Sequence, residues 1–166
     1  HFTNIMNKFI STLFYSGLSP IAPGTMGSLL ALILILPLAF VPQNLHIIFS
    51  FFVLSLLFGF YSIPKYLQGK TDDLQEIVID EAAGLYLTIL LVIIILRVCG
   101  VKSNSLVIFG MSFVFFRIFD ITKPLIIGYY DRTLKGATGI MVDDLLAGIF
   151  AGISVSILLI IFHTLK

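Results

Sequence analysis

The sequence predicts an all-α fold: a polytopic membrane helix bundle with about five transmembrane helices and an N-terminal interfacial helix. The chain is 58% hydrophobic and only 11% charged, whereas a soluble domain carries about 25% charged residues. Its mean hydropathy is +1.09. Residues 9–64 contain no Asp, Glu, Lys or Arg, a gap that no soluble protein of this size would leave. No internal repeat or linker interrupts the pattern, so we expect residues 1–166 to form a single integral-membrane domain.

The predicted elements follow in order along the chain. Residues 4–15 carry apolar side chains at Ile5, Phe9, Ile10 and Leu13, a spacing typical of a helix that lies in the membrane interface. A helix needs about 20 apolar residues to cross a hydrocarbon core of ~30 Å. Five later segments qualify, some of them barely: residues 26–41, 45–63, 82–98, 105–119 and 145–162.

The charges predict the orientation of the bundle. With five spans, one side of the membrane carries most of the basic residues and the other carries Arg97, Lys102 and Lys166. The positive-inside rule places the basic side in the cytoplasm, with the N-terminus inside and the C-terminus outside. All nine acidic residues lie on that same side. Because the rule does not govern acids, their one-sided placement predicts a functional site. The basic residues of this side are Lys8, Lys65, Lys70, Arg117, Lys123, Arg132 and Lys135.

Several classes of function are disfavoured by composition. A net charge of +1 provides no basic stripe for nucleic acid. The single cysteine, Cys99, excludes an internal disulfide. The three histidines are terminal or belong to the side opposite the acids, so a nucleophilic Cys/His or Ser/His/Asp site is not expected.

A loop rich in Gly, Pro, Ser and Thr, residues 16–28, leads into the first span. Its prolines fix the backbone and its glycines permit tight turns and close approach. We expect Thr25 to cap the first span, whose free N–H groups favour an anion. An ordinary capped loop is the alternative interpretation.

Asp80 and Glu81 are adjacent and precede the third span. Simple helix capping would explain them. Against that, Ile77, Val78 and Ile79 lie immediately upstream and draw the pair towards apolar surroundings, where carboxylates without partners are costly.

Arg117, Asp120 and Lys123 follow one another at steps of three, so neighbouring members share a helix face. One interpretation is a salt-bridge ladder at the membrane boundary. However, the uncharged residues 103–116 cover only about 21 Å as a helix. Arg117 and Asp120 are therefore expected near the head-group level, where ionisable residues are rare and usually functional.

Asp143 and Asp144 are expected to begin the fifth span, at the positive end of its helix dipole. Arg132 and Lys135 lie in the loop before them. Further along, small residues recur at helical spacing and predict close helix packing rather than chemistry: Ala147 with Ala151, and Gly148 with Gly152.

The side with most of the charges combines carboxylates, basic side chains and helix ends. Carboxylate oxygens without His or Cys suit Mg²⁺ better than zinc. Basic side chains, helix N-termini and Mg²⁺ all bind phosphate. The residues therefore predict a Mg²⁺-dependent site for a phosphorylated head group at the cytoplasmic membrane surface. Two alternatives stay open. The chain could be a transporter, or it could be an assembly subunit whose charges only pair with each other.

Four motifs in this order, SGLSPIAPGTMGS, IVIDEAAG, FRIFDITKP and GIMVDDLLAG, closely resemble the phosphatidylglycerophosphatase A family. The resemblance implies a bacterial inner-membrane enzyme that removes the terminal phosphate from phosphatidylglycerophosphate with Mg²⁺. It implies catalytic roles for Asp80, Glu81, Asp120, Asp143 and Asp144, with metal ligands among Glu81, Asp120, Asp143 and Asp144. It implies substrate binding by Ser19, Gly24, Thr25, Ser28, Arg117, Lys123, Asp131 and Arg132. Which member of each adjacent acidic pair faces the metal, and whether one or two ions bind, stays open.

Overall fold

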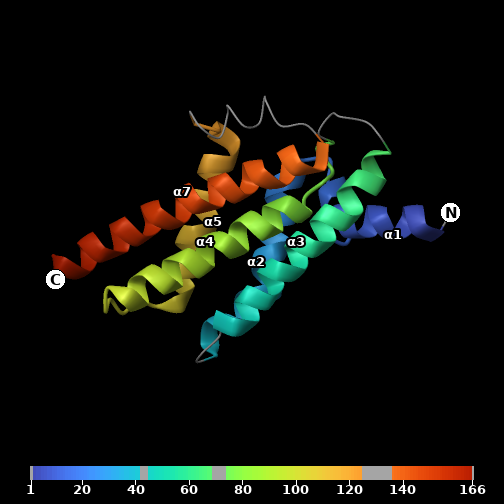
Figure 1. Cartoon of the computed structure of the whole chain (residues 1–166). Helices are drawn as coiled ribbons and strands as arrows, with labels where there is room; N and C mark the ends of the chain where they lie inside the picture. The colour runs from blue at the N-terminus through green and yellow to red at the C-terminus, as the bar shows by residue number, and fades with distance from the viewer. Residues whose placement is uncertain (1, 42–44, 69–73, 125–135, 166) are drawn as a thin grey trace.

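The computed structural model describes residues 2–41, 45–68, 74–124 and 136–165, and within these ranges every regular element is a helix, without strands. Five helices are long and apolar enough to cross a membrane, which confirms the predicted fold class. Figure 1 shows their arrangement. The elements are α1 (Phe2–Ser11), a 3₁₀ turn (Ser16–Leu18), α2 (Pro23–Ile35) continued by a 3₁₀ segment (Leu36–Phe40), α3 (Leu45–Leu67), α4 (Ile79–Val98), α5 (Ser105–Thr122) and α7 (Gly136–Thr164).

Helix α4 is the central element of the bundle. It contacts α2, α3, α5 and α7, and 72% of its most apolar window is buried, against 22–39% for the other spans. A helix that is apolar all round is expected to be enclosed by neighbours or lipid. Figure 1 shows α4 and α7 running side by side.

The α4–α7 contact is made possible by glycine. A Cβ built on Gly148 would lie only 2.5 Å from the carbonyl oxygen of Gly84. Thr88 Oγ1 donates to the carbonyl oxygens of Gly84, at 2.9 Å, and Gly148, at 3.1 Å. The small residues predicted to pack are all buried, which confirms that prediction: Ala147, Gly148, Ala151 and Gly152.

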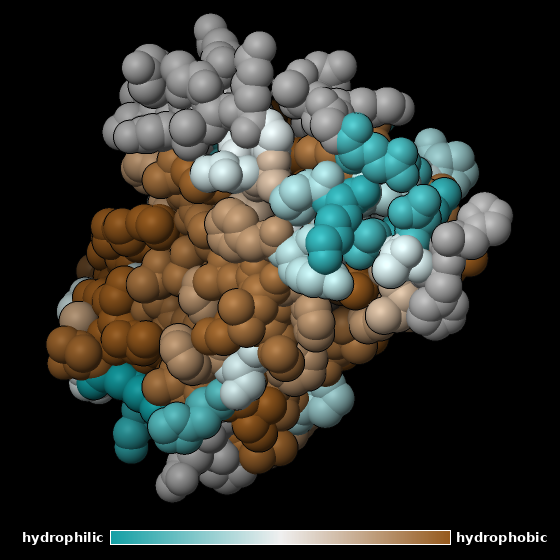
Figure 2. Space-filling model, turned by 45° about the vertical axis from the view of Figure 1, so that its right-hand side comes forward, coloured by the Kyte–Doolittle hydropathy of each residue, from teal (hydrophilic) through white to brown (hydrophobic). Residues whose placement is uncertain are grey.

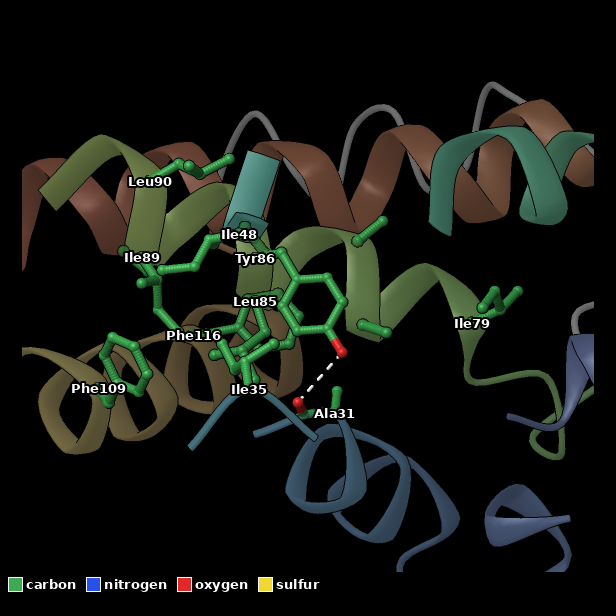
Figure 3. Close-up of a cluster of buried hydrophobic side chains, with 14 of the residues drawn as sticks. Ala31, Ile35, Ile48, Ile79, Leu85, Tyr86, Ile89, Leu90, Phe109 and Phe116 are labelled. Carbon is green, nitrogen blue, oxygen red and sulfur yellow. Dashed lines mark hydrogen bonds between the residues drawn. The ribbon is translucent and has the colours of Figure 1, made fainter. Parts of the chain in front are cut away.

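A buried tyrosine joins α4 to its other neighbours. The Tyr86 hydroxyl donates to the carbonyl oxygen of Ala31 on α2 at 3.1 Å, as Figure 3 shows. Its ring meets Phe51 of α3 edge to face, with ring centroids 5.8 Å apart. Such edge contacts add about 0.5–1.5 kcal/mol beyond burial.

The N-terminal helix is tied to the bundle at its last residue. Ser11 Oγ donates to Ser62 Oγ of α3 at 2.9 Å, and the Val78 N–H donates to the Ser11 carbonyl at 2.9 Å. The helix ends at Ser11, whereas we expected it to reach residue 15. The reason is a left-handed turn, because residues 13–15 adopt φ values of 43°, 56° and 67°.

The outer surface of the spans is apolar. Large hydrophobic side chains such as Leu57, Ile121 and Ile157 are exposed. Figure 2 shows a largely apolar body with hydrophilic areas gathered towards its ends. An apolar surface of this extent is typical of contact with lipid.

Candidate active site

Helix direction collects the polar residues at one end of the bundle. Successive spans run in opposite directions, so α2, α4 and α7 begin at the end where α5 finishes. The first turn of α4 carries Asp80 and Glu81. The last two turns of α5 carry Arg117 and Asp120.

Three carboxylates from two helices meet at this end. Asp120 of α5 and the α7 residues Asp143 and Asp144 each offer one oxygen, and these atoms all lie within 4.8 Å of one another. Asp143 and Asp144 are both only 4% exposed. Asp80 and Glu81 also act electrostatically on Asp144. So many like charges away from water are unfavourable unless a cation or proton compensates them.

Arg117 joins α2, α4 and α5 at the centre of this cluster. Its Nη1 lies 3.5 Å from Glu81 Oε1 and donates to Asp120 Oδ2 at 2.5 Å. The same nitrogen donates to Ser28 Oγ at 3.3 Å, and that hydroxyl donates to the Gly24 carbonyl at 2.9 Å. The arginine side chain is only 13% exposed, so these bonds form in a medium of low dielectric.

Lys123 brings a second cation to the carboxylates. It follows α5 as the C-cap residue, with a φ of 40°, and its ammonium forms an ion pair with the Asp143 carboxylate. The predicted ion pair within α5 is present between Arg117 and Asp120. Lys123, however, pairs with Asp143 on α7. The charges connect helices instead of only following one helix face.

Two glycines on α2 allow Glu81 to approach the helix. A Cβ on Gly24 would collide with the Glu81 carboxylate and lie 3.1 Å from Arg117 Nη2. A Cβ on Gly27 would lie 2.5 Å from Val78 Cβ and 3.0 Å from Glu81 Oε2. Sequence reasoning expected the glycines of residues 16–28 to permit close approach, but it did not assign Gly27 to the site. The three-residue spacing of the two glycines, which places them on one helix face, is the signal that could have found it.

Two expectations about helix starts were wrong. Thr25 does not cap α2, because the N-cap residue is Ala22 and the helix begins at Pro23. Asp143 and Asp144 do not begin the last helix, which starts at Gly136. They lie about two turns inside it, beyond the first turn where the dipole acts.

The remaining predicted residues are placed as follows. Thr25 is half-buried in the first turn of α2. The Ser19 hydroxyl serves its own loop, donating to the Ile21 carbonyl at 3.0 Å. The N-cap residue of α4 is Val78, so neither Asp80 nor Glu81 caps the helix. Both acids lie in its first turn and are buried, whereas a capping residue can stay exposed to solvent. Asp131 and Arg132 lie outside the described residues.

The chemistry of the carboxylate cluster fits Mg²⁺. All three clustered donors are hard oxygens. Asp144 Oδ2 is buried and accepts no hydrogen bond from the described part of the chain. A buried carboxylate oxygen that accepts no hydrogen bond is suited to act as a metal ligand.

Comparison with known proteins gives a family match and several similar relatives. The chain matches the family described as phosphatidylglycerophosphatase A over residues 9–159. It is 36% identical over 151 residues to phosphatidylglycerophosphatase A of Escherichia coli strain K12, covering 90% of this chain and 80% of the relative. It is also 36% identical over 144 residues to phosphatidylglycerophosphatase A of Haemophilus influenzae, covering 86% and 82% respectively.

A third relative bears a different name. A Bacteroides thetaiotaomicron protein, provisionally named phosphatidylinositol-3-phosphatase, is 33% identical over 153 residues, covering 89% of this chain and 90% of the relative. No solved structure matches the chain. The family match covers nearly the whole chain and includes every residue of the carboxylate cluster and of the Arg117 contacts, and this chain therefore belongs to the phosphatidylglycerophosphatase A family.

Proposed function

We propose that this chain is a Mg²⁺-dependent phosphatase that hydrolyses phosphatidylglycerophosphate to phosphatidylglycerol and inorganic phosphate at the cytoplasmic face of a bacterial membrane. The observation that carries the proposal is the meeting of partly buried Asp120 with buried Asp143 and Asp144 beside Arg117 and Lys123. This arrangement combines metal-binding oxygens with cations that suit a phosphate monoester. Membership of the family supports the same activity.

Asp120, Asp143 and Asp144 would hold Mg²⁺, with Glu81 as a further ligand. Bound Mg²⁺ supplies charge neutralisation at the phosphoryl oxygens and a lowered pKa for an attacking water. Hydrolysis forms a bond from the water oxygen to phosphorus and breaks the bond from phosphorus to the ester oxygen. That oxygen leaves as a hydroxyl of phosphatidylglycerol after taking up a proton.

The chain's own cations would orient the substrate. Arg117 is held by Glu81, Asp120 and Ser28, so its guanidinium is preorganised for charge that develops on the phosphoryl group. Lys123 would exchange part of its contact with Asp143 for a phosphate oxygen. Asp80, in the first turn of α4, is available as a general base.

The location of the site favours a lipid substrate. Exposed apolar residues, Ile118 and Ile121 on α5 and Met26 on α2, lie on the helices that carry Arg117, Asp120 and Gly24. The acyl chains can stay in the bilayer while the head group reaches the carboxylates. The excess of Lys and Arg on this side supports a cytoplasmic site.

The two alternative classes fit the structure less well. A transporter usually places its binding groups near the bilayer midplane, whereas these acids gather at one end of the bundle. An assembly subunit would need its charges only to pair with each other. Charge pairing would place each carboxylate beside a cation and would not require three carboxylate oxygens within 4.8 Å of one another.

Substrate identity is tested by phosphate release from two lipids. Purified wild-type protein in detergent with Mg²⁺ should release phosphate from phosphatidylglycerophosphate with a kcat/KM at least about tenfold above that for phosphatidylinositol 3-phosphate, about 1.4 kcal/mol in transition-state binding. Equal or reversed values would overturn the substrate assignment. Release from neither lipid would overturn the assignment as a lipid phosphatase.

A further inference from the structure

A cavity lined by both polar and apolar side chains lies at the far end of the bundle, between the end of α4 and the start of α5. Its volume is about 340 Å³. Arg97, Lys102, Ser103 and Ser105 line it, and Ile93 and Phe109 contribute apolar wall. Helix α4 rises about 27 Å from Asp80 to Val98, so this cavity is separate from the carboxylate cluster.

The charged side chains that line this cavity are positive. Among the residues that the structure describes, Arg97 and Lys102 line it and no acid does. The acidic residues that the structure describes, from Glu76 to Asp144, belong to the opposite end of the bundle, around the starts of α4 and α7 and the end of α5. Figure 2 shows hydrophilic areas at separate ends of an apolar body. Two cations without an acidic neighbour complement an anionic ligand.

The apolar wall of the cavity favours a lipid ligand over a free anion. Ile93, Ile108 and Phe109 are buried beneath the cavity. Val98 and Val107, on the two helices that form it, are exposed as lipid-facing residues are. A ligand bound here would meet cations and hydroxyls at one level and hydrocarbon below it. Basic pockets between membrane helices bind phospholipid head groups on the cytoplasmic side, and the same pairing of cations with a phosphate can form at the opposite surface.

We propose that this cavity binds one anionic phospholipid through its phosphodiester group, in the leaflet opposite the carboxylate cluster. Arg97 and Lys102 neutralise the phosphate, while the hydroxyls of Ser103 and Ser105 donate to its oxygens. The acyl chains descend along the exposed face of α5, starting beside the exposed last turn of α4. The proposal is independent of the phosphatase activity, because it uses none of the residues of the carboxylate cluster.

The test is native mass spectrometry of the full chain in detergent, titrated with phosphatidylserine, phosphatidylcholine or inorganic phosphate. Phosphatidylserine is anionic but is neither substrate nor product of the proposed reaction. Wild-type protein should bind one phosphatidylserine at least tenfold more tightly than phosphatidylcholine, and excess inorganic phosphate should not displace it. Arg97→Gln/Lys102→Gln should weaken phosphatidylserine binding about tenfold or more.

The matched control removes the same charge elsewhere. Lys8→Gln/Lys65→Gln alters the other end of the molecule and should leave phosphatidylserine affinity within twofold of wild type. Ser105→Leu fills the cavity without a change of charge and should also weaken binding. Arg97→Lys/Lys102→Arg should retain it. Equal loss in the control, unchanged binding in the cavity variants, or displacement by inorganic phosphate would overturn the proposal. Thermal unfolding verifies that each variant is folded.

Discussion

Arg117 is the residue on which the geometry of the cluster depends most. It connects Glu81, Asp120 and Ser28 through one nitrogen. Arg117→Lys keeps the charge but replaces the rigid, planar guanidinium by a flexible ammonium, and it removes the Nε and Nη2 donors that stay available to a phosphate while Nη1 holds its three partners. We expect kcat to fall about 10²-fold or more, with the protein still folded. Phosphate release measured across substrate concentrations separates this fall from a change in KM.

The contrasting variant is Lys123→Arg, which keeps a cation beside Asp143 at a C-cap position open to solvent on one side. It should retain activity within about tenfold. If Arg117→Lys were as active as Lys123→Arg, Arg117 would not have the preorganising role assigned to it.

Gly24 is a residue where a single methyl group should matter. Its Cβ would collide with the Glu81 carboxylate, so Gly24→Ala must displace Glu81 or Arg117. A misplacement of about 1 Å can cost on the order of 10²-fold in rate. The expected result is a loss of that order in kcat, measured by phosphate release.

The matched control for Gly24 is Gly110→Ala on α5, where a new Cβ would meet nothing within 4 Å. This substitution should leave activity unchanged and raise stability by up to about 1 kcal/mol. Equal activity of the two alanine variants would contradict the account of α2 packing against Glu81.

At the scale of elements, the α4–α7 contact holds two parts of the cluster in register. Gly148→Val would force the helices apart, because a Cβ there lies 2.5 Å from the Gly84 carbonyl oxygen. We expect destabilisation of about 1–3 kcal/mol, seen as a lower midpoint of thermal unfolding in detergent, together with reduced activity. Ile149→Val, an exposed neighbour on the same helix, should change neither. A Gly148→Val protein as stable as wild type would show that the helices do not need this close approach.

The spans themselves could be predicted from sequence because length and hydropathy are local properties. Helix starts were predicted less well. Asp143 and Asp144 were expected to begin the last span, yet α7 begins at Gly136 and buries Gly139. Glycine lowers helix propensity by only about 1 kcal/mol, and packing against α4 can exceed that. The left-handed turn at residues 13–15 has no sequence signal, since none of them is glycine.

The sequence singled out the acids and bases that gather at one end of the bundle, but it did not reveal the contacts between them. Acids and bases stood out because so few other residues of the chain are polar. The pairing of Lys123 with Asp143 and of Arg117 with Glu81 depends on the register between helices. That register is set by buried contacts such as Gly84 with Gly148, which spacing within one helix does not reveal.

At the scale of the whole molecule, the orientation in the membrane can be tested with the chain's own cysteine. Cys99 is exposed at the end of α4 remote from the acids. With the carboxylate cluster in the cytoplasm, a membrane-impermeant maleimide added to intact spheroplasts should label Cys99. The expected result is labelling without permeabilisation.

The control for orientation is Cys99→Ser combined with Gln68→Cys, which moves the thiol to an exposed polar position directly after α3, at the end of the bundle that carries the acids. This protein should be labelled only after permeabilisation. The reverse pattern in the two proteins would place the carboxylate cluster outside the cell and contradict the predicted topology.

The central claim is that Asp120, Asp143 and Asp144 hold the Mg²⁺ that supports hydrolysis. Its most direct test is phosphate release from phosphatidylglycerophosphate by wild type and Asp120→Asn over a range of Mg²⁺ concentrations. Wild type should show saturable dependence on Mg²⁺, lose activity in EDTA and regain it with added Mg²⁺. Folded, membrane-inserted Asp120→Asn should be at least about 10³-fold slower. Near wild-type turnover by Asp120→Asn, or full activity of wild type in EDTA, would contradict the account.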